Sequence, residues 1–122
     1  MHAFKEADMS YLEDLSGGDQ SLIIEMLRLF LSQTPGYLDS LSRHIDLGDW
    51  SNTQSMAHHI KPTLAYMGAE DMRQALIRIE QMAKADPVDS VVLRREFSVL
   101  RGRFEVLFKE LEGHLGFLTS KM

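Results

Sequence analysis

The chain has 122 residues, of which 44% are hydrophobic and 25% are charged, and this length and composition favour a single globular domain (residues 1–122) over a disordered chain. Its formal net charge of −5 argues against nucleic acid or an anionic membrane surface as the main partner, because phosphate groups are bound by clustered Lys and Arg. The chain has no cysteine, which excludes disulfides and thiolate metal sites.

No stretch of the sequence favours insertion into a membrane or secretion. All apolar runs are shorter than a membrane span, and the N-terminal residues lack the apolar core of a signal peptide. We therefore expect a cytoplasmic protein with no membrane partner. The initial Met1 and the free-standing helical pattern favour a separate protein over a piece of a larger kinase, and we expect this protein to be a monomer.

The first half of the chain shows helical spacing of apolar residues and no convincing strand. A short amphipathic segment around Leu12 ends at the break of residues 16–19, where Asp19 can cap the next helix. The stripe of that next helix comprises Leu22, Met26, Leu29, Phe30 and Gln33. We expect Thr34-Pro35-Gly36 to bend or interrupt it, and a resumed segment to run to Gly48.

The second half continues the helical pattern. Asp49 can cap a helix that runs to Gly68, where glycine can adopt the left-handed conformation that ends helices. A fourth helix stops before Asp86-Pro87, which we expect to cap and open the last helix. The stripe of the last helix comprises Leu93, Phe97, Leu100, Phe104, Phe108, Leu111, Leu115 and Leu118. The predicted fold is all-α, an antiparallel up-down four-helix bundle with a short extra N-terminal helix.

The helix that begins after Asp49 presents a histidine beside a lysine. Its apolar stripe comprises Thr53, Met56, Ala57, Ile60, Leu64 and Met67. His58 points about 150° away from the centre of this stripe and therefore faces water. Lys61 lies about 60° round from His58, so its ammonium group can reach an anion carried on the imidazole. This pattern suits a histidine that carries a phosphoryl group.

A carboxylate is expected beside the same histidine. If the third and fourth helices fold back about position 69, residues equally far from this pivot lie side by side, and His58 is matched by Glu80. Glu80 is expected at the solvent edge of the core stripe, where it can accept a hydrogen bond from Nδ1–H of His58. That bond would leave Nε2 free to attack phosphorus, while Lys61 stabilises the charge.

The chain resembles the histidine-containing phosphotransfer (HPt) domains over most of its length. The family motif Ala-His-x-Leu-Lys-Gly-(Ser/Ala) is similar to Ala57-His58-His59-Ile60-Lys61-Pro62-Thr63, the family's Leu-Gly-Ala to Met67-Gly68-Ala69, and its Leu-Glu to Ile79-Glu80. The resemblance implies a four-helix module that relays phosphoryl groups between receiver-domain aspartates. By this resemblance, His58 is the phosphoacceptor, Lys61 stabilises the phosphate and Glu80 orients the imidazole.

The resemblance also implies partners. These are the receiver domains of response regulators, with a hybrid sensor histidine kinase as a further candidate, and no cofactor is expected. The sequence has no Gly-rich nucleotide-binding loop, so we expect a phosphotransfer intermediate without autonomous kinase activity.

Pro62 departs from the family, which usually has glycine there. Proline removes the N–H that would bond to the carbonyl of His58, so we expect a local bend.

A docked receiver must cover the helix surface around His58. Gln54, Pro62 and Ala65 lie on the same side of the helix within roughly 100° of arc and are expected to contact it. His59 lies about 100° from His58 and turns away from Lys61, which predicts a receiver contact at the edge of the site. Met67 is expected to border the docking patch.

Two other kinds of function are compatible with a helical bundle. The first is metal binding through histidines, of which the candidates are His44, His58, His59 and His114. The sequence lacks the Glu-x-x-His pairs expected of metal sites in such bundles, and no metal is expected. The second is a non-catalytic interaction protein, which would take up no label from a phosphorylated receiver.

Overall fold

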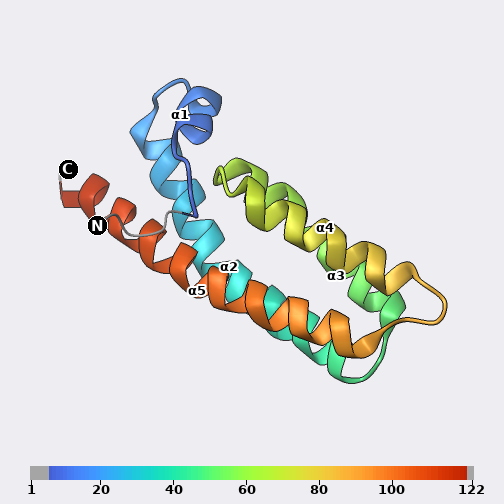
Figure 1. The fold of residues 1–122 in the computed structure, drawn as a ribbon. Coiled ribbons are helices and arrows are strands. Elements are labelled where there is room, and N and C mark those ends of the chain that lie inside the picture. The colour runs from blue at the N-terminus through green and yellow to red at the C-terminus, as the bar shows by residue number, and fades with distance from the viewer. Residues whose placement is uncertain (1–5, 121–122) are drawn as a thin grey trace, which may run out of the picture.

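A computed structural model describes residues 6–120, and every regular element in that range is a helix, in agreement with the expected all-α fold. The helices are α1 (Ser10–Ser16), α2 (Gln20–Asp46), α3 (Trp50–Tyr66), α4 (Glu70–Lys84) and α5 (Ser90–Ser120) (Figure 1). Residues 1–5 and 121–122 of the expected domain, including Met1, lie outside the described range. Within that range, no helix is both long enough and apolar enough to cross a membrane.

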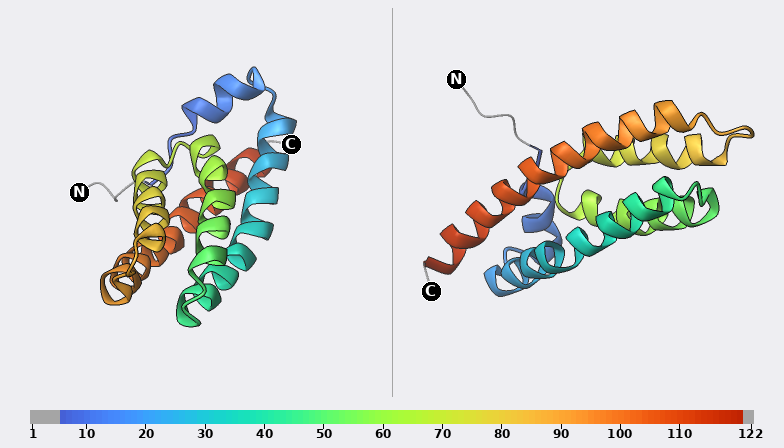
Figure 2. Two further views of the ribbon diagram at one scale, coloured as in Figure 1. Left: turned by 90° about the vertical axis from the view of Figure 1, so that its right-hand side faces the viewer. Right: turned by 90° about the horizontal axis from the view of Figure 1, so that it is seen from below.

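The four longer helices form a closed bundle. Helices α2 and α4 each pack against both α3 and α5, and consecutive helices run in opposite directions (Figures 1 and 2). Helix α1 packs against α2 at the end of the bundle where α3 and α4 are joined. The short turn between α3 and α4 makes these two helices close neighbours along their length, which positions the site.

Aspartate side chains cap α2, α3 and α5, though not all at the expected places. Asp19 accepts a hydrogen bond from the backbone N–H of Leu22, and Asp49 accepts one from that of Asn52, as predicted. The expected cap at Asp86-Pro87 is wrong. Helix α5 begins at Ser90, and Asp89 accepts a hydrogen bond from the backbone N–H of Val92. Asp89 directly precedes the first helical residue, which is the position where a cap can reach free N–H groups.

The expected interruption of the second helix is also wrong, because α2 continues through Pro35. Pro35 is exposed, so the carbonyl of Leu31 that loses its partner N–H lies on the side of the helix that water reaches. The stripe predicted for the first half of α2 is displaced as well. Leu22 and Leu29 are exposed, whereas the buried residues of this half are Ile23, Ile24, Leu27 and Phe30. An unbroken apolar run such as residues 22–24 leaves the choice of face open.

The core is built from the stripes of all four long helices. In α3 the predicted stripe is buried except for Met56, which is partly exposed. In α5 the predicted stripe is buried as far as Leu111, and Leu107 joins it. Leu115 and Leu118 are partly buried against the core. This packing fixes which face of α3 points outwards.

Candidate functional site

His58 lies on the outward face of α3, and its side chain is 75% exposed. Its neighbours Ala57 and Ile60 are fully buried, so the backbone of the helix is held against the core while the imidazole projects into solvent. The Nδ1 atom of the ring lies 3.5 Å from Oε2 of Glu80 on α4. This distance is at the outer limit of a hydrogen bond. The pairing of positions 58 and 80 across the turn is therefore as predicted.

Glu80 lies deeper than expected. Its predicted place at the solvent edge is wrong, because the residue is only 5% exposed. Its other carboxylate oxygen, Oε1, accepts a hydrogen bond from Nζ of Lys61 at 2.5 Å. A buried carboxylate needs a cation and hydrogen bonds to replace water, and Lys61 supplies both.

Lys61 thus contacts the carboxylate that approaches His58. Its side chain is 20% exposed, so the ammonium group lies at the border between the α3–α4 interface and solvent. The three side chains form a row in which Glu80 stands between a histidine and a lysine. The negative charge on Glu80 favours a protonated Nδ1, and the exposed Nε2 is then the nitrogen with a free lone pair.

The other residues that were predicted to contact a receiver differ in how far they are buried. Gln54 is half-buried, and its Nε2 donates to the carbonyl of Ala83 at 3.1 Å. Pro62 is exposed within the unbroken helix α3, and Ala65 is half-buried. Met67 completes the apolar stripe of α3 as its spacing predicted, and it is only 2% exposed, so its side chain offers almost no surface at the border of a docking patch.

His59 is exposed on the side of α3 that faces α2, away from the row of Lys61, Glu80 and His58. Its ring meets that of Tyr37 edge-on, with centroids 4.8 Å apart and an angle of 90° between the planes. Tyr37 in turn donates a hydrogen bond from its hydroxyl to Oε1 of Gln33. The two adjacent histidines therefore belong to different helix interfaces, and only His58 has a carboxylate beside it.

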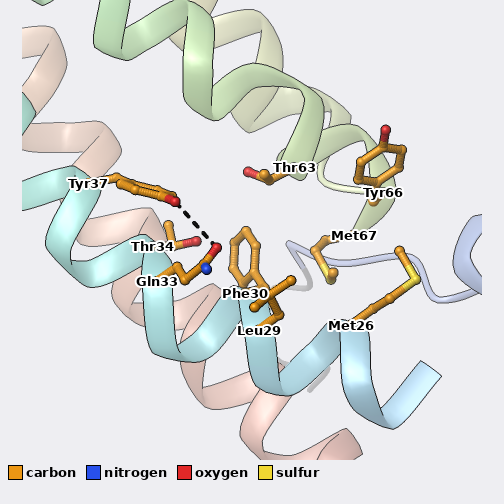
Figure 3. Close-up of a pocket in the computed structure, with 9 residues that line it drawn as sticks. All are labelled: Met26, Leu29, Phe30, Gln33, Thr34, Tyr37, Thr63, Tyr66 and Met67. Atoms are coloured by element: carbon orange, nitrogen blue, oxygen red, sulfur yellow. Dashed lines mark hydrogen bonds between the residues drawn. The ribbon is translucent and has the colours of Figure 1, made fainter. Parts of the chain in front are cut away.

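A cavity of about 170 Å³ lies between α2 and the C-terminal part of α3 (Figure 3). It is lined by Met26, Leu29, Phe30, Gln33, Thr34, Tyr37, Thr63, Tyr66 and Met67. The helical spacing of apolar residues does not reveal this cavity, because it depends on Leu29 facing outwards and not into the core. None of the lining residues is charged, so the cavity offers no group for phosphoryl chemistry.

Residues 6–120 bring together no group of three or more His, Cys, Asp or Glu side chains that could hold a metal ion.

Comparison with known proteins places this geometry in a family. Residues 25–113 match the Hpt domain, and this segment contains α3, α4 and all three residues of the row. The chain belongs to the Hpt domain family. Its α1 and the residues before it lie outside the matched segment of the Hpt domain.

A curated relative is the phosphorelay intermediate protein rdeA of Dictyostelium discoideum, which is 26% identical to the chain over 107 residues. The match covers 88% of this chain and 41% of the relative, so the chain spans about two fifths of the length of that protein. No solved structure matches the chain significantly.

Proposed function

We propose that this Hpt domain acts as a phosphorelay intermediate, in which His58 accepts a phosphoryl group from a receiver-domain aspartate and passes it to a second receiver. The observation that carries this proposal is the pairing of an exposed imidazole with a buried carboxylate, at 3.5 Å between Nδ1 and Oε2. The family match and the relative described as a phosphorelay intermediate support the same function.

In the proposed reaction, Nε2 of His58 attacks the phosphorus of the aspartyl phosphate. The N–P bond forms as the bond between phosphorus and the aspartate oxygen breaks, and the aspartate leaves as a carboxylate. The proton on Nδ1 stays on the ring, where Glu80 stabilises the positive charge that develops. Lys61 binds the same carboxylate that His58 approaches, and it can turn from Glu80 towards the phosphoryl oxygens because its side chain borders solvent.

The phosphoryl group must come from another protein, because the chain has no Gly-rich nucleotide-binding loop. We infer that receiver domains of response regulators are the partners, with a hybrid sensor histidine kinase as one source of such a domain. The proposed docking surface is the outward face of α3 around His58, with Pro62 and Ala65 beside the acceptor and His59 at the edge. We propose that residues 1–122 form a single domain and that this domain acts as a monomer.

Replacement of the acceptor tests this function. Incubation of the protein with a phosphorylated receiver should give an acid-labile, base-stable label, which His58→Gln abolishes. His59→Gln is the matched control, since it removes the adjacent imidazole without touching Glu80, and it should keep the label. A label that survives in His58→Gln and disappears in His59→Gln would move the acceptor by one residue. No label on the wild type with any receiver of the source genome would favour a non-catalytic interaction protein.

A further inference from the structure

The side chain of Gln54 joins α3 to α4 close to the acceptor. It lies one helical turn before His58 and donates from Nε2 to the backbone carbonyl of Ala83, which lies three positions after Glu80. This hydrogen bond therefore spans the two helices immediately beside the His58–Glu80 pair. Its acceptor is a carbonyl in the last turn of α4, one of the groups that a helix end leaves without an intrahelical partner.

A second connection lies at the other end of the α3–α4 pair. Residues 6–8, which we call the strap, cross from α5 to the turn between α3 and α4. The backbone N–H of Asp8 donates to the carbonyl of Met67 at 3.1 Å. The carboxylate of Glu6 accepts two hydrogen bonds from Arg103 of α5, at 2.7 and 2.8 Å. The backbone N–H of Glu6 also donates to the carboxylate of Glu110, so the strap is fixed to α5 at two points.

The turn is packed closely beneath the strap. Gly68 has a φ of +66°, which side chains rarely adopt, and a Cβ there would lie 2.1 Å from the carbonyl oxygen of Asp8. The strap thus contacts the backbone of the turn directly, with no side chain in between. Glycine at this position therefore allows the backbone turn that ends α3 and also leaves room for the strap.

The charges around Arg103 extend this connection to α4. The carboxylate of Glu6 raises the pKa of the Arg103 guanidinium, and Asp71 in the first turn of α4 adds a smaller effect in the same direction. The side chain of Glu6 is only 2% exposed, so its pairing with Arg103 is largely shielded from water. Strap, turn and α5 therefore meet at one place, and Asp71 of α4 is near enough to act on Arg103 through its charge.

We propose that Gln54 and Glu6 are positioning residues, which hold α3 and α4 in the register that places Glu80 beside His58. The two connections lie on either side of the site, one at the C-terminal end of α4 and the other at the turn. Register matters because a shift of one residue turns a helix position by about 100°. At 3.5 Å the Nδ1 and Oε2 atoms leave little slack for such movement. The expected effect on the rate of phosphotransfer rests on the proposed function. The expected effect on which ring nitrogen of His58 carries the proton does not.

The test compares Gln54→Ala, Glu6→Gln and the double variant with two matched controls. Gln74→Ala removes a glutamine that bonds only within α4, and Asp39→Asn breaks an ion pair between α2 and α5 outside the strap. The ¹⁵N chemical shifts of the His58 ring report which nitrogen carries the proton, and they are measured without any receiver. The rate of phosphotransfer is measured separately and normalised to the folded fraction from circular dichroism.

We expect each positioning variant to lower the fraction of His58 that is protonated at Nδ1, and the controls to leave it unchanged. The double variant should slow transfer about tenfold or more, because a 1 Å misplacement can cost on the order of 100-fold. If the double variant does not fold, the single variants, which each keep one connection, carry the comparison.

Unchanged ring shifts in both single variants would overturn the proposal. If transfer slowed in Gln54→Ala while the shifts stayed as in the wild type, Gln54 would be a receiver contact and not a positioning residue. Altered shifts with no transfer in the wild type would contradict the proposed function and leave the positioning role standing. The two ideas can therefore fail separately.

Discussion

Glu80 is the residue on which the site depends, because its carboxylate serves two neighbours at once. One oxygen binds Lys61 and the other faces Nδ1 of His58. Among residues 6–120, no buried side-chain nitrogen or oxygen lacks a hydrogen-bond partner, so the burial of this acid is compensated. We therefore expect Glu80 to contribute both to the fold and to the proposed phosphotransfer.

Glu80→Ala should therefore destabilise the protein, because it removes a buried carboxylate and leaves the half-buried side chain of Lys61 without its partner. We expect a loss of about 1–3 kcal/mol in the free energy of unfolding, the usual cost of a polar group left unpaired. Glu80→Gln keeps an acceptor for Lys61 and should lose less stability, while the rate of phosphotransfer falls in both variants. Urea denaturation and transfer assays measure the two effects.

Glu105→Ala is the control for this pair of variants, since Glu105 is an exposed acid on α5. It should change the free energy of unfolding by no more than about 0.5 kcal/mol. Equal effects of Glu80→Ala and Glu105→Ala on stability would mean that the contact with Lys61 contributes nothing to the fold.

At the residue scale, the sequence predicted the members of the site better than their environment. His58 and Glu80 could be paired because helix angles and the symmetry of a hairpin need only local information. The depth of Glu80 could not be predicted, since it depends on how α4 tilts against its neighbours. The bond from Gln54 to Ala83 was missed for a similar reason, because a backbone carbonyl that accepts a hydrogen bond has no signature in the sequence.

Two helices continue through a proline, and each therefore lacks one of its backbone hydrogen bonds. Pro35 lies within α2 and Pro62 within α3, and both residues are exposed. Each proline leaves one carbonyl of the preceding turn without its N–H partner, that of Leu31 in α2 and that of His58 in α3. Only the second of these carbonyls belongs to His58, the proposed phosphoacceptor.

The matched variants Pro35→Ala and Pro62→Ala should separate stability from recognition. Both restore a helical hydrogen bond, and we expect each to raise the free energy of unfolding by about 2 kcal/mol, the helix penalty of proline less its advantage in the unfolded chain. Transfer rates against a panel of receivers should change their ranking in Pro62→Ala and keep it in Pro35→Ala. An unchanged ranking in both would show that Pro62 has no part in partner choice.

At the scale of elements, the sequence predicted all the helical segments and two of the caps, but it misjudged the start of α5 and the continuity of α2. Asp19 and Asp49 could be identified because a cap acts on N–H groups within its own turn. Before α5 the sequence analysis placed the cap at Asp86 because of the proline that follows it, whereas the residue that caps the helix is Asp89. The continuity of α2 was missed because the penalty of a proline was judged without the packing of Phe30 and Leu38 on either side of it.

For the molecule as a whole, α1 closes the end of the bundle. Helices α2 and α5 are much longer than α3 and α4, and α1 packs on α2 near the turn that joins the shorter pair (Figure 1). Leu12 of α1 is fully buried and belongs to the main core, although it precedes the segment that matches the family. Helix α1 is thus part of the folded core. The amphipathic spacing around Leu12 predicted a helix there, but it could not predict that this helix packs on the end of the bundle.

Leu12→Ala tests this role of α1 in the whole molecule. Removal of a fully buried leucine side chain should lower the free energy of unfolding by about 2–5 kcal/mol, because it loses apolar contacts and leaves a cavity. Tyr11→Ala, on the exposed neighbour in the same helix, is the control and should cost much less. Thermal unfolding followed by circular dichroism gives both values. If Leu12→Ala unfolded at the same temperature as Tyr11→Ala, α1 would rest on the bundle without contributing to its stability.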